Sequence, residues 1–143
     1  MIKVKGCRVK LWTSVYSTKD ETLDLLGRKL GHKDVESKMI KGQQRFNNVT
    51  KRYSRPWWAT VYHFLSEYDN VFHVEECNKE WLQDWNDEVP ILVELVKKHG
   101  YKVKLEYDIA LNPGTYPSIE FSTEFLSHLA KFECEINMSF LHE

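Results

Sequence analysis

The feature that most constrains the fold of this 143-residue chain is an alternation of apolar and polar side chains. Residues 102–111, KVKLEYDIAL, place an apolar side chain at every second position. Residues 7–15 and 134–141 repeat this alternation, and residues 57–65 are rich in β-branched and aromatic side chains. A period of two is typical of a strand that buries one face. We therefore expect a sheet that is covered on one side.

Helical spacing separates these expected strands. Leu23, Leu26 and Leu30 recur every three or four residues, and Gly31 follows as a typical helix stop. Near the end of the chain, Ser122 opens a segment with the pattern of a capped helix, because a serine oxygen there can accept a free backbone N–H. Both segments predict short helices that pack an apolar face against the sheet.

The middle of the chain predicts more helix. Asn78 is a common N-cap residue type, and helical periodicity runs from it to Trp85. The apolar face continues over residues 91–96, but Pro90 intervenes. Proline is tolerated in a first helical turn and breaks a helix interior. We expect either two abutting helices or one kinked helix.

Together these segments predict one α+β domain over residues 1–143. A further short strand is expected at 118–121, after the turn signal Asn-Pro-Gly at 112–114. The predicted order is β-α-β-α-β-β-α-β, with an antiparallel or mixed sheet and helices packed on one face. Residues 32–56 are polar, basic and weakly periodic, and we interpret them as a long excursion with room for a short strand.

Motifs for chemistry are absent from the sequence. The six histidines form no HxH or HExxH pattern, no GxSxG is present, and no glycine-rich loop opens a helix. We therefore predict a non-enzymatic protein without catalytic residues, cofactors or a metal site. An unrecognised enzyme remains an alternative, and a pocket that combines His63 or His73 with a carboxylate would favour it.

The cysteines and the hydropathy indicate a cellular setting. Three widely spaced cysteines form no CxxC pair, which argues against a disulfide framework and a zinc site. No apolar run approaches the roughly 20 residues that span a bilayer. We expect a cytoplasmic protein that does not contact a membrane.

Charge is distributed unevenly along the chain. Residues 1–60 carry 14 Lys/Arg against 5 Asp/Glu, whereas residues 61–143 carry 6 against 16. Between Glu67 and Glu94 there are nine acids and the single base Lys79. Neighbouring strands can come from opposite halves of a chain, so the sequence leaves open whether the charges form two separate faces.

The acids at 75–88 surround two tryptophans, Trp81 and Trp85, four residues apart. Both belong to one helical face, and we expect Trp85 to be buried and Trp81 to lie nearer the surface. A partly exposed tryptophan amid acids is typical of a binding anchor with a charged rim. The predicted partner-binding residues are Glu75, Glu76, Glu80, Trp81, Asp84, Asp87 and Glu88.

An acidic surface of this kind suits a bacterial immunity protein. Nuclease toxins bind phosphate backbones with basic clefts, so an inhibitor gains association rate and affinity from clustered carboxylates. We predict a protein partner with a basic surface, namely a cognate toxin. The alternative is that the acids form a solvent-facing side of the helix and bind no partner.

Residues 38–58, KMIKGQQRFNNVTKRYSRPWW, suggest another class of function. Interleaved bases and aromatics are typical of single-stranded nucleic-acid binding, because bases stack on rings and phosphates contact cations. Against this reading, the whole-chain pI of about 6.6 is not basic. A basic loop that balances the neighbouring acidic helix is the simpler interpretation.

The chain also resembles an uncharacterised, mostly bacterial family known as domain of unknown function 4279. The matching stretches are the opening strand, DETLDLLG at 20–27, the Lys41-Gly42 turn, a tryptophan at 57 or 58 and the closing strand-helix-strand unit 119–140. The chain departs from the family pattern at 43–55 and in the density of tryptophan and acid at 75–88. The resemblance implies the α+β fold and no catalytic residues.

Overall fold

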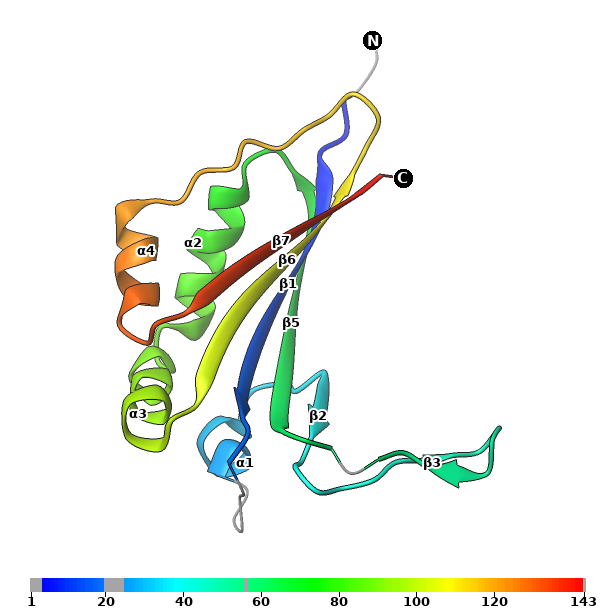
Figure 1. Ribbon diagram of the computed structural model, residues 1–143. Helices are drawn as coiled ribbons and strands as arrows, with labels where there is room; N and C mark the ends of the chain where they lie inside the picture. Colours follow the sequence, from blue (N-terminus) through cyan, green and yellow to red (C-terminus); the bar gives the residue numbers. More distant parts are fainter. Residues whose placement is uncertain (1–3, 20–24, 56, 143) are drawn as a thin grey trace.

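The computed structural model describes residues 4–19, 25–55 and 57–142, and its centre is a five-stranded sheet (Figure 1). The strands of this sheet are β1 (Cys7–Ser17), β2 (Ser37–Met39), β5 (Thr60–Val71), β6 (Lys102–Leu111) and β7 (Glu135–His142). Their spatial order is β2-β5-β1-β6-β7. Strand β1 is antiparallel to β5 and β6, whereas β7 is parallel to β6. The sheet is therefore mixed.

In the described part of the chain, four helices accompany the sheet: α1 (Leu25–Leu30), α2 (Val74–Trp85), α3 (Val89–His99) and α4 (Thr123–Ala130). Figure 1 shows α2, α3 and α4 together on one side of the sheet. The predicted α+β architecture with helices on one face is confirmed. Ser122 caps α4 as predicted, because its side chain accepts the backbone N–H of Phe125 at 3.1 Å.

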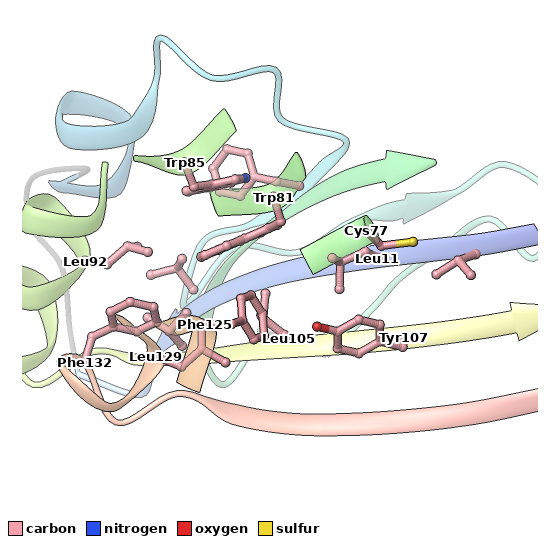
Figure 2. Packing of buried hydrophobic residues seen from close by; sticks show 14 of the residues in the cluster. Leu11, Cys77, Trp81, Trp85, Leu92, Leu105, Tyr107, Phe125, Leu129 and Phe132 are labelled. Carbon is pink, nitrogen blue, oxygen red and sulfur yellow. The ribbon is translucent and has the colours of Figure 1, made fainter. Parts of the chain in front are cut away.

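The predicted alternation holds along the whole of β6, and in β1 it is interrupted only at Ser14, which is also buried. In β6 every second residue from Val103 to Leu111 is buried, while the residues between them remain partly exposed. A slip of one residue would move charged side chains such as Lys104 and Glu106 into the core, so burial fixes the register. The buried side chains of the sheet and the helices form one apolar cluster, part of which Figure 2 shows.

The middle helical region forms two abutting helices, one of the two expected arrangements. Pro90 lies in the first turn of α3, where its missing N–H costs no hydrogen bond. Helix α2 begins at Val74, four residues before Asn78, so the predicted N-cap is wrong. Asn78 is instead a buried residue whose Oδ1 accepts the Tyr107 hydroxyl at 2.5 Å. Gly100 ends α3 in the left-handed conformation, with φ 71.

Two segments differ from the predicted element order. The basic excursion contains the edge strand β2 and also an unpredicted two-stranded pair, β3 (Phe46–Asn47) and β4 (Arg52–Tyr53). Residues 118–121 form no strand, and only Ser118 makes a single bridge, to His73. Segment 118–121 does not pair with β6, because β1 lies on one side of β6 and β7 on the other. Strand β7 follows α4 and runs parallel to β6. Of the leucines predicted for the first helix, Leu23 lies outside the described residues.

Candidate binding surfaces

The inner face of α2 carries both tryptophans of the acidic segment (Figure 2). Trp81 is 0% exposed and Trp85 is 2% exposed, and their rings stack with centroids 5.7 Å apart. The indole Nε1 of Trp81 donates a hydrogen bond to Thr13 Oγ1 at 2.8 Å. Burial of Trp85 is confirmed, but the prediction that Trp81 lies nearer the surface is wrong. Trp81 therefore cannot anchor a partner on this surface.

Both rings fit beneath α2 because the inner face has helical spacing along its whole length. Its buried residues include Val74, Cys77, Trp81 and Trp85. Successive steps of three or four residues keep these side chains in one stripe. The ammonium of Lys33 lies 4.6 Å from the centroid of a Trp85 ring and covers it from outside the core. Sequence spacing gave no sign of this cover, because Lys33 comes from a distant segment.

The outer face of α2 presents carboxylates to solvent. Glu76, Glu80 and Asp84 are exposed on the helix, and Asp87 is exposed just beyond its last residue. We call these four residues the acidic face. Glu75, in the first turn, is only half-buried and lies at its margin. The structure thus brings together on one surface most of the carboxylates predicted to bind a partner.

Glu88 does not belong to this surface. It is only 7% exposed, and its Oε1 lies 3.0 Å from Nε2 of His32. Its other oxygen, Oε2, lies 3.6 Å from Nζ of Lys33. A carboxylate that is buried needs such partners, because desolvation penalises the charged form. The prediction that Glu88 binds a partner is therefore wrong. Glu88 instead connects the loop that follows α1, through His32 and Lys33, to the start of α3.

Few bases compensate the acidic face. Lys33 Nζ lies 3.5 Å from Asp84 Oδ1 and donates a hydrogen bond to the Asp84 carbonyl at 2.6 Å. In residues 4–19, 25–55 and 57–142, no ion pair joins Arg45, Arg52 or Arg55 to α2. The interpretation that the basic loop balances the acidic helix therefore finds no support in direct contacts.

The carboxylates of the acidic face also act on groups beneath them. Burial raises the pKa of the Cys77 thiol to about 12, and the charges of Glu80 and Glu76 contribute in the same direction. Burial likewise raises the pKa of Tyr68 to about 12, with smaller contributions from Glu80 and Asp84. Each carboxylate disfavours a further negative charge nearby. The surface of α2 is thus a region of negative potential.

Two exposed apolar side chains lie near the N-terminal end of the acidic face. Phe72 is 37% exposed and immediately precedes the His73–Ser118 bridge, and Ile119 immediately follows it on the other segment. Backbone bonds from Ser118 N to Phe72 O and from Val74 N to Ser118 O hold the two segments together at 2.8 and 2.9 Å. Sequence reasoning missed this pair because its members come from distant segments.

A second candidate surface is the β3–β4 hairpin, which extends away from the sheet (Figure 1). We call residues 42–58 the basic arm. Backbone bonds from Gly42 N to Trp57 O and from Ser54 N to Arg45 O, both 2.8 Å long, fasten its two sides together. The Phe46 and Tyr53 rings contact each other across the hairpin with centroids 5.0 Å apart.

The basic arm leaves its functional groups open to solvent. Tyr53 is 68% exposed, Trp58 66% and Phe46 42%. A hollow of about 520 Å³ is lined by Arg45, Phe46, Asn47, Asn48, Thr50, Arg52, Tyr53 and Ser54. Within the described part of the chain, no acid lies within ion-pair distance of Arg45 or Arg52. The arm can thus offer both cations and rings to a ligand.

His63, one of the two histidines considered above for an enzyme, lies on the helix-free face of the sheet. Nδ1 of His63 lies 2.8 Å from Oγ of Ser14, its direct neighbour across β1 and β5. Burial lowers the pKa of His63, although the charge of Glu106 opposes this. Ser14 is 4% exposed, too enclosed to reach a substrate carbonyl in this arrangement. We interpret the pair as a cross-strand hydrogen bond.

No three His, Cys, Asp or Glu side chains gather as metal ligands would, in the part of the chain that the structure describes. Across the same residues, none of the helices combines the length and apolarity needed to cross a membrane. Comparisons with protein-family models, curated proteins and solved structures find no match to this chain. The candidate functions therefore rest on the two surfaces themselves.

Proposed function

We propose that this chain is a non-enzymatic protein-binding domain, and specifically an immunity protein whose acidic face covers the basic surface of a toxin. The observation that carries the proposal is the exposure of Glu76, Glu80 and Asp84 on α2 and of Asp87 just beyond its end. Among their side chains, an ion pair to another segment is formed by Asp84, with Lys33. Carboxylates without compensating cations give a field that attracts a basic partner.

Rigid placement of the acidic face supports the proposal. The opposite side of α2 is fixed in the core by Trp81 and Trp85, so the helix presents its carboxylates without reordering on binding. Preorganised groups lose less conformational freedom when a complex forms. A nuclease toxin fits the partner best, because its substrate cleft must be basic to bind phosphates.

Phe72 and Ile119 replace Trp81 as the proposed apolar anchors. Both are exposed near the first turn of α2, where Glu75 and Glu76 supply acidic neighbours. Protein interfaces commonly combine a small apolar centre with a polar rim. We place the protein in the cytoplasm, where its free cysteines would remain reduced. We also propose that the chain is a member of the domain of unknown function 4279 family, which it resembles in sequence.

The test uses the purified protein as bait in a lysate of its source organism. The acidic-face variant carries Glu76→Lys, Glu80→Lys and Asp87→Lys, and leaves the Asp84–Lys33 pair in place. The control variant carries Glu36→Lys, Glu67→Lys and Asp69→Lys, three exposed acids outside α2. Each set changes the formal net charge from −1 to +5. Differences between the two variants therefore report position rather than total charge.

We expect the parent and the control variant to capture the same basic protein, and the acidic-face variant to lose it. Expression of the captured protein should arrest cell growth, and the parent and control variant should restore growth. A captured protein without toxicity, or equal capture by both variants, contradicts the proposal.

The basic arm supports a second candidate function, the binding of single-stranded nucleic acid. Its specific observation is the hollow that combines two arginines with the Phe46–Tyr53 ring pair. Affinity for a fluorescent oligonucleotide would fall steeply with salt, because each neutralised phosphate releases counterions. Tyr53→Ala together with Arg52→Ala should weaken binding, whereas the acidic-face variant should not. Absence of binding at micromolar protein in roughly 50 mM salt would exclude this function.

A further inference from the structure

Strand β7 leaves one of its edges without a strand neighbour. In the described chain it pairs with β6 alone, at one end of the sheet. The strand is 8 residues long, whereas β2 at the opposite end has 3. Figure 1 shows β7 as the outermost long strand. An unpaired edge of this length offers a row of backbone N–H and C=O groups to another strand.

The sequence of β7 lacks the usual protection of a free edge. EINMSFLH contains neither lysine, arginine nor proline, and Glu135 is its one acid. The pairing with β6 runs from Glu135 to His142 without a register shift, so no bulge bends the strand away. Phe140 and Leu141 are 46% and 57% exposed. A long, regular edge with exposed apolar side chains is a typical pairing site.

A second copy of β7 matches this edge. In an antiparallel pair related by a two-fold axis perpendicular to the sheet, even-numbered residues face even-numbered residues, because each side chain keeps its own face. With the axis at Met138, Ile136 faces Phe140 of the other copy and Met138 faces itself. These side chains share the face of the sheet that carries the helices, where Ile136 and Met138 are partly buried against the core.

The helix-free face is compatible with the same register. There Asn137 faces Ser139, and Glu135 faces Leu141, so no two carboxylates meet. Shifting the axis to Ser139 would place Ile136 opposite His142 and interrupt the apolar row. The register centred on Met138 keeps all three apolar side chains of the helix-side face opposite one another.

We propose that the protein is a homodimer formed by antiparallel pairing of β7 with β7 about Met138. The two five-stranded sheets then continue into one sheet, with all helices on the same side. The assembly closes after two copies, because each copy uses its β7 edge once. The acidic face takes no part in this contact, so the inference stands independently of the proposed function.

The register is tested by disulfide formation in a Cys134→Ser background, since Cys7 and Cys77 are buried. Met138→Cys places two thiols opposite each other at a Cα separation of about 4.5–5.5 Å, which a disulfide can bridge. Ile136→Cys is the matched control, because two copies of residue 136 would lie four positions apart, about 13 Å. Mild oxidation should join two Met138→Cys chains by a disulfide, and should leave the Ile136→Cys chains without a covalent crosslink, as a non-reducing denaturing gel would show.

Sedimentation equilibrium supplies a second measurement that needs no cysteine. The parent should sediment at twice the 17.0 kDa chain mass at micromolar concentration. Phe140→Lys should raise the dimer dissociation constant at least about tenfold, because it introduces a charge between paired strands. Ser37→Lys on the β2 edge should leave the dissociation constant unchanged. A monomeric parent, equal crosslinking of both cysteine variants or an unaffected Phe140→Lys dimer overturns the proposal.

Discussion

Trp81 can be buried because its indole N–H donates a hydrogen bond to the hydroxyl of Thr13. Its indole N–H lies in the core and is satisfied by Thr13, which comes from the sheet 68 residues earlier. A large ring with one polar atom is stable in an apolar interior when that atom has a hydrogen-bond partner. The residue therefore contributes to stability rather than to the surface.

Thr13→Val should lower the free energy of unfolding by about 1–3 kcal/mol, because it leaves the buried indole N–H unpaired at nearly constant volume. Urea unfolding followed by tryptophan fluorescence measures the change. Trp58→Phe, at a ring that is 66% exposed, is the control and should change stability little. If Thr13→Val unfolds at the parent's urea concentration, the hydrogen bond does not stabilise the core.

The raised pKa of the Cys77 thiol makes the stability of the fold depend on pH in the alkaline range. Burial raises the pKa of its thiol from 9.0 to about 12 in the folded state. Between these values the unfolded chain loses the thiol proton and the folded chain keeps it, so the free energy of unfolding should fall as pH rises. The fall begins near pH 9, and Cys134 and Tyr68 contribute in the same direction.

Guanidinium unfolding between pH 8 and pH 11 measures this effect. Cys77→Ala should be less stable at pH 8 and should lose less stability over the alkaline range than the parent. Identical pH slopes for the two proteins would show that the thiol remains ionisable in the fold.

Residue-scale sequence reasoning succeeded where the determining partner is local. Burial of Trp85 follows from its helical stripe, and Ser122 caps α4 through a contact three residues away. The errors at Trp81 and Glu88 have another cause: Thr13 and the His32–Lys33 pair lie far from them in sequence. No spacing rule links those positions.

Helix α2 has two faces with different roles: the inner face stabilises the fold, and the outer face is proposed to bind a partner. Its inner residues pack in the core, while the carboxylates of the acidic face lie in solvent. Exposed charges contribute little to stability, typically less than about 1 kcal/mol per pair. The acidic-face variant should therefore retain the parent's circular dichroism spectrum and melt within a few degrees of it. A large loss of melting temperature would show that these carboxylates stabilise the fold.

The basic arm is an element that the core does not require. None of its residues from 42 to 55 belongs to the apolar cluster, and its backbone bonds mostly join one side of the hairpin to the other. Replacing residues 45–54 by Asn-Gly, a favoured two-residue hairpin turn, should change the free energy of unfolding by less than about 1 kcal/mol. Urea unfolding measures this, and cooperative loss of the whole fold would contradict it.

At the same scale, periodicity explains which elements were predictable. Strands β1, β6 and β7 alternate clearly, and burial of one face leaves them few other arrangements. The arm has no such pattern, because its strands are short and exposed on both sides. Segment 118–121 alternates but lacks a neighbouring strand beyond one bridge. A strand needs a partner as well as a pattern.

In the whole molecule the acidic face and the basic arm lie apart, although acids and bases also lie side by side across the sheet, as where Lys10 lies opposite Glu67 and Asp108. The acidic face lies on the helical layer, and the basic arm extends from the other end of the sheet (Figure 1). The sequence left this question open, because the sheet mixes strands from both halves. The resulting field should guide a charged partner toward one side of the protein.

The most direct test of that claim is the association rate constant of the captured partner, measured at low and high ionic strength by stopped-flow fluorescence. At low salt the acidic-face variant should associate at least about tenfold more slowly than the parent, because steering raises association rates by this order or more. The difference should shrink above about 0.5 M salt, where exposed charges are screened within a few ångströms. The control variant should remain close to the parent. Equal low-salt rates for the parent and the acidic-face variant would contradict recognition through the acidic face.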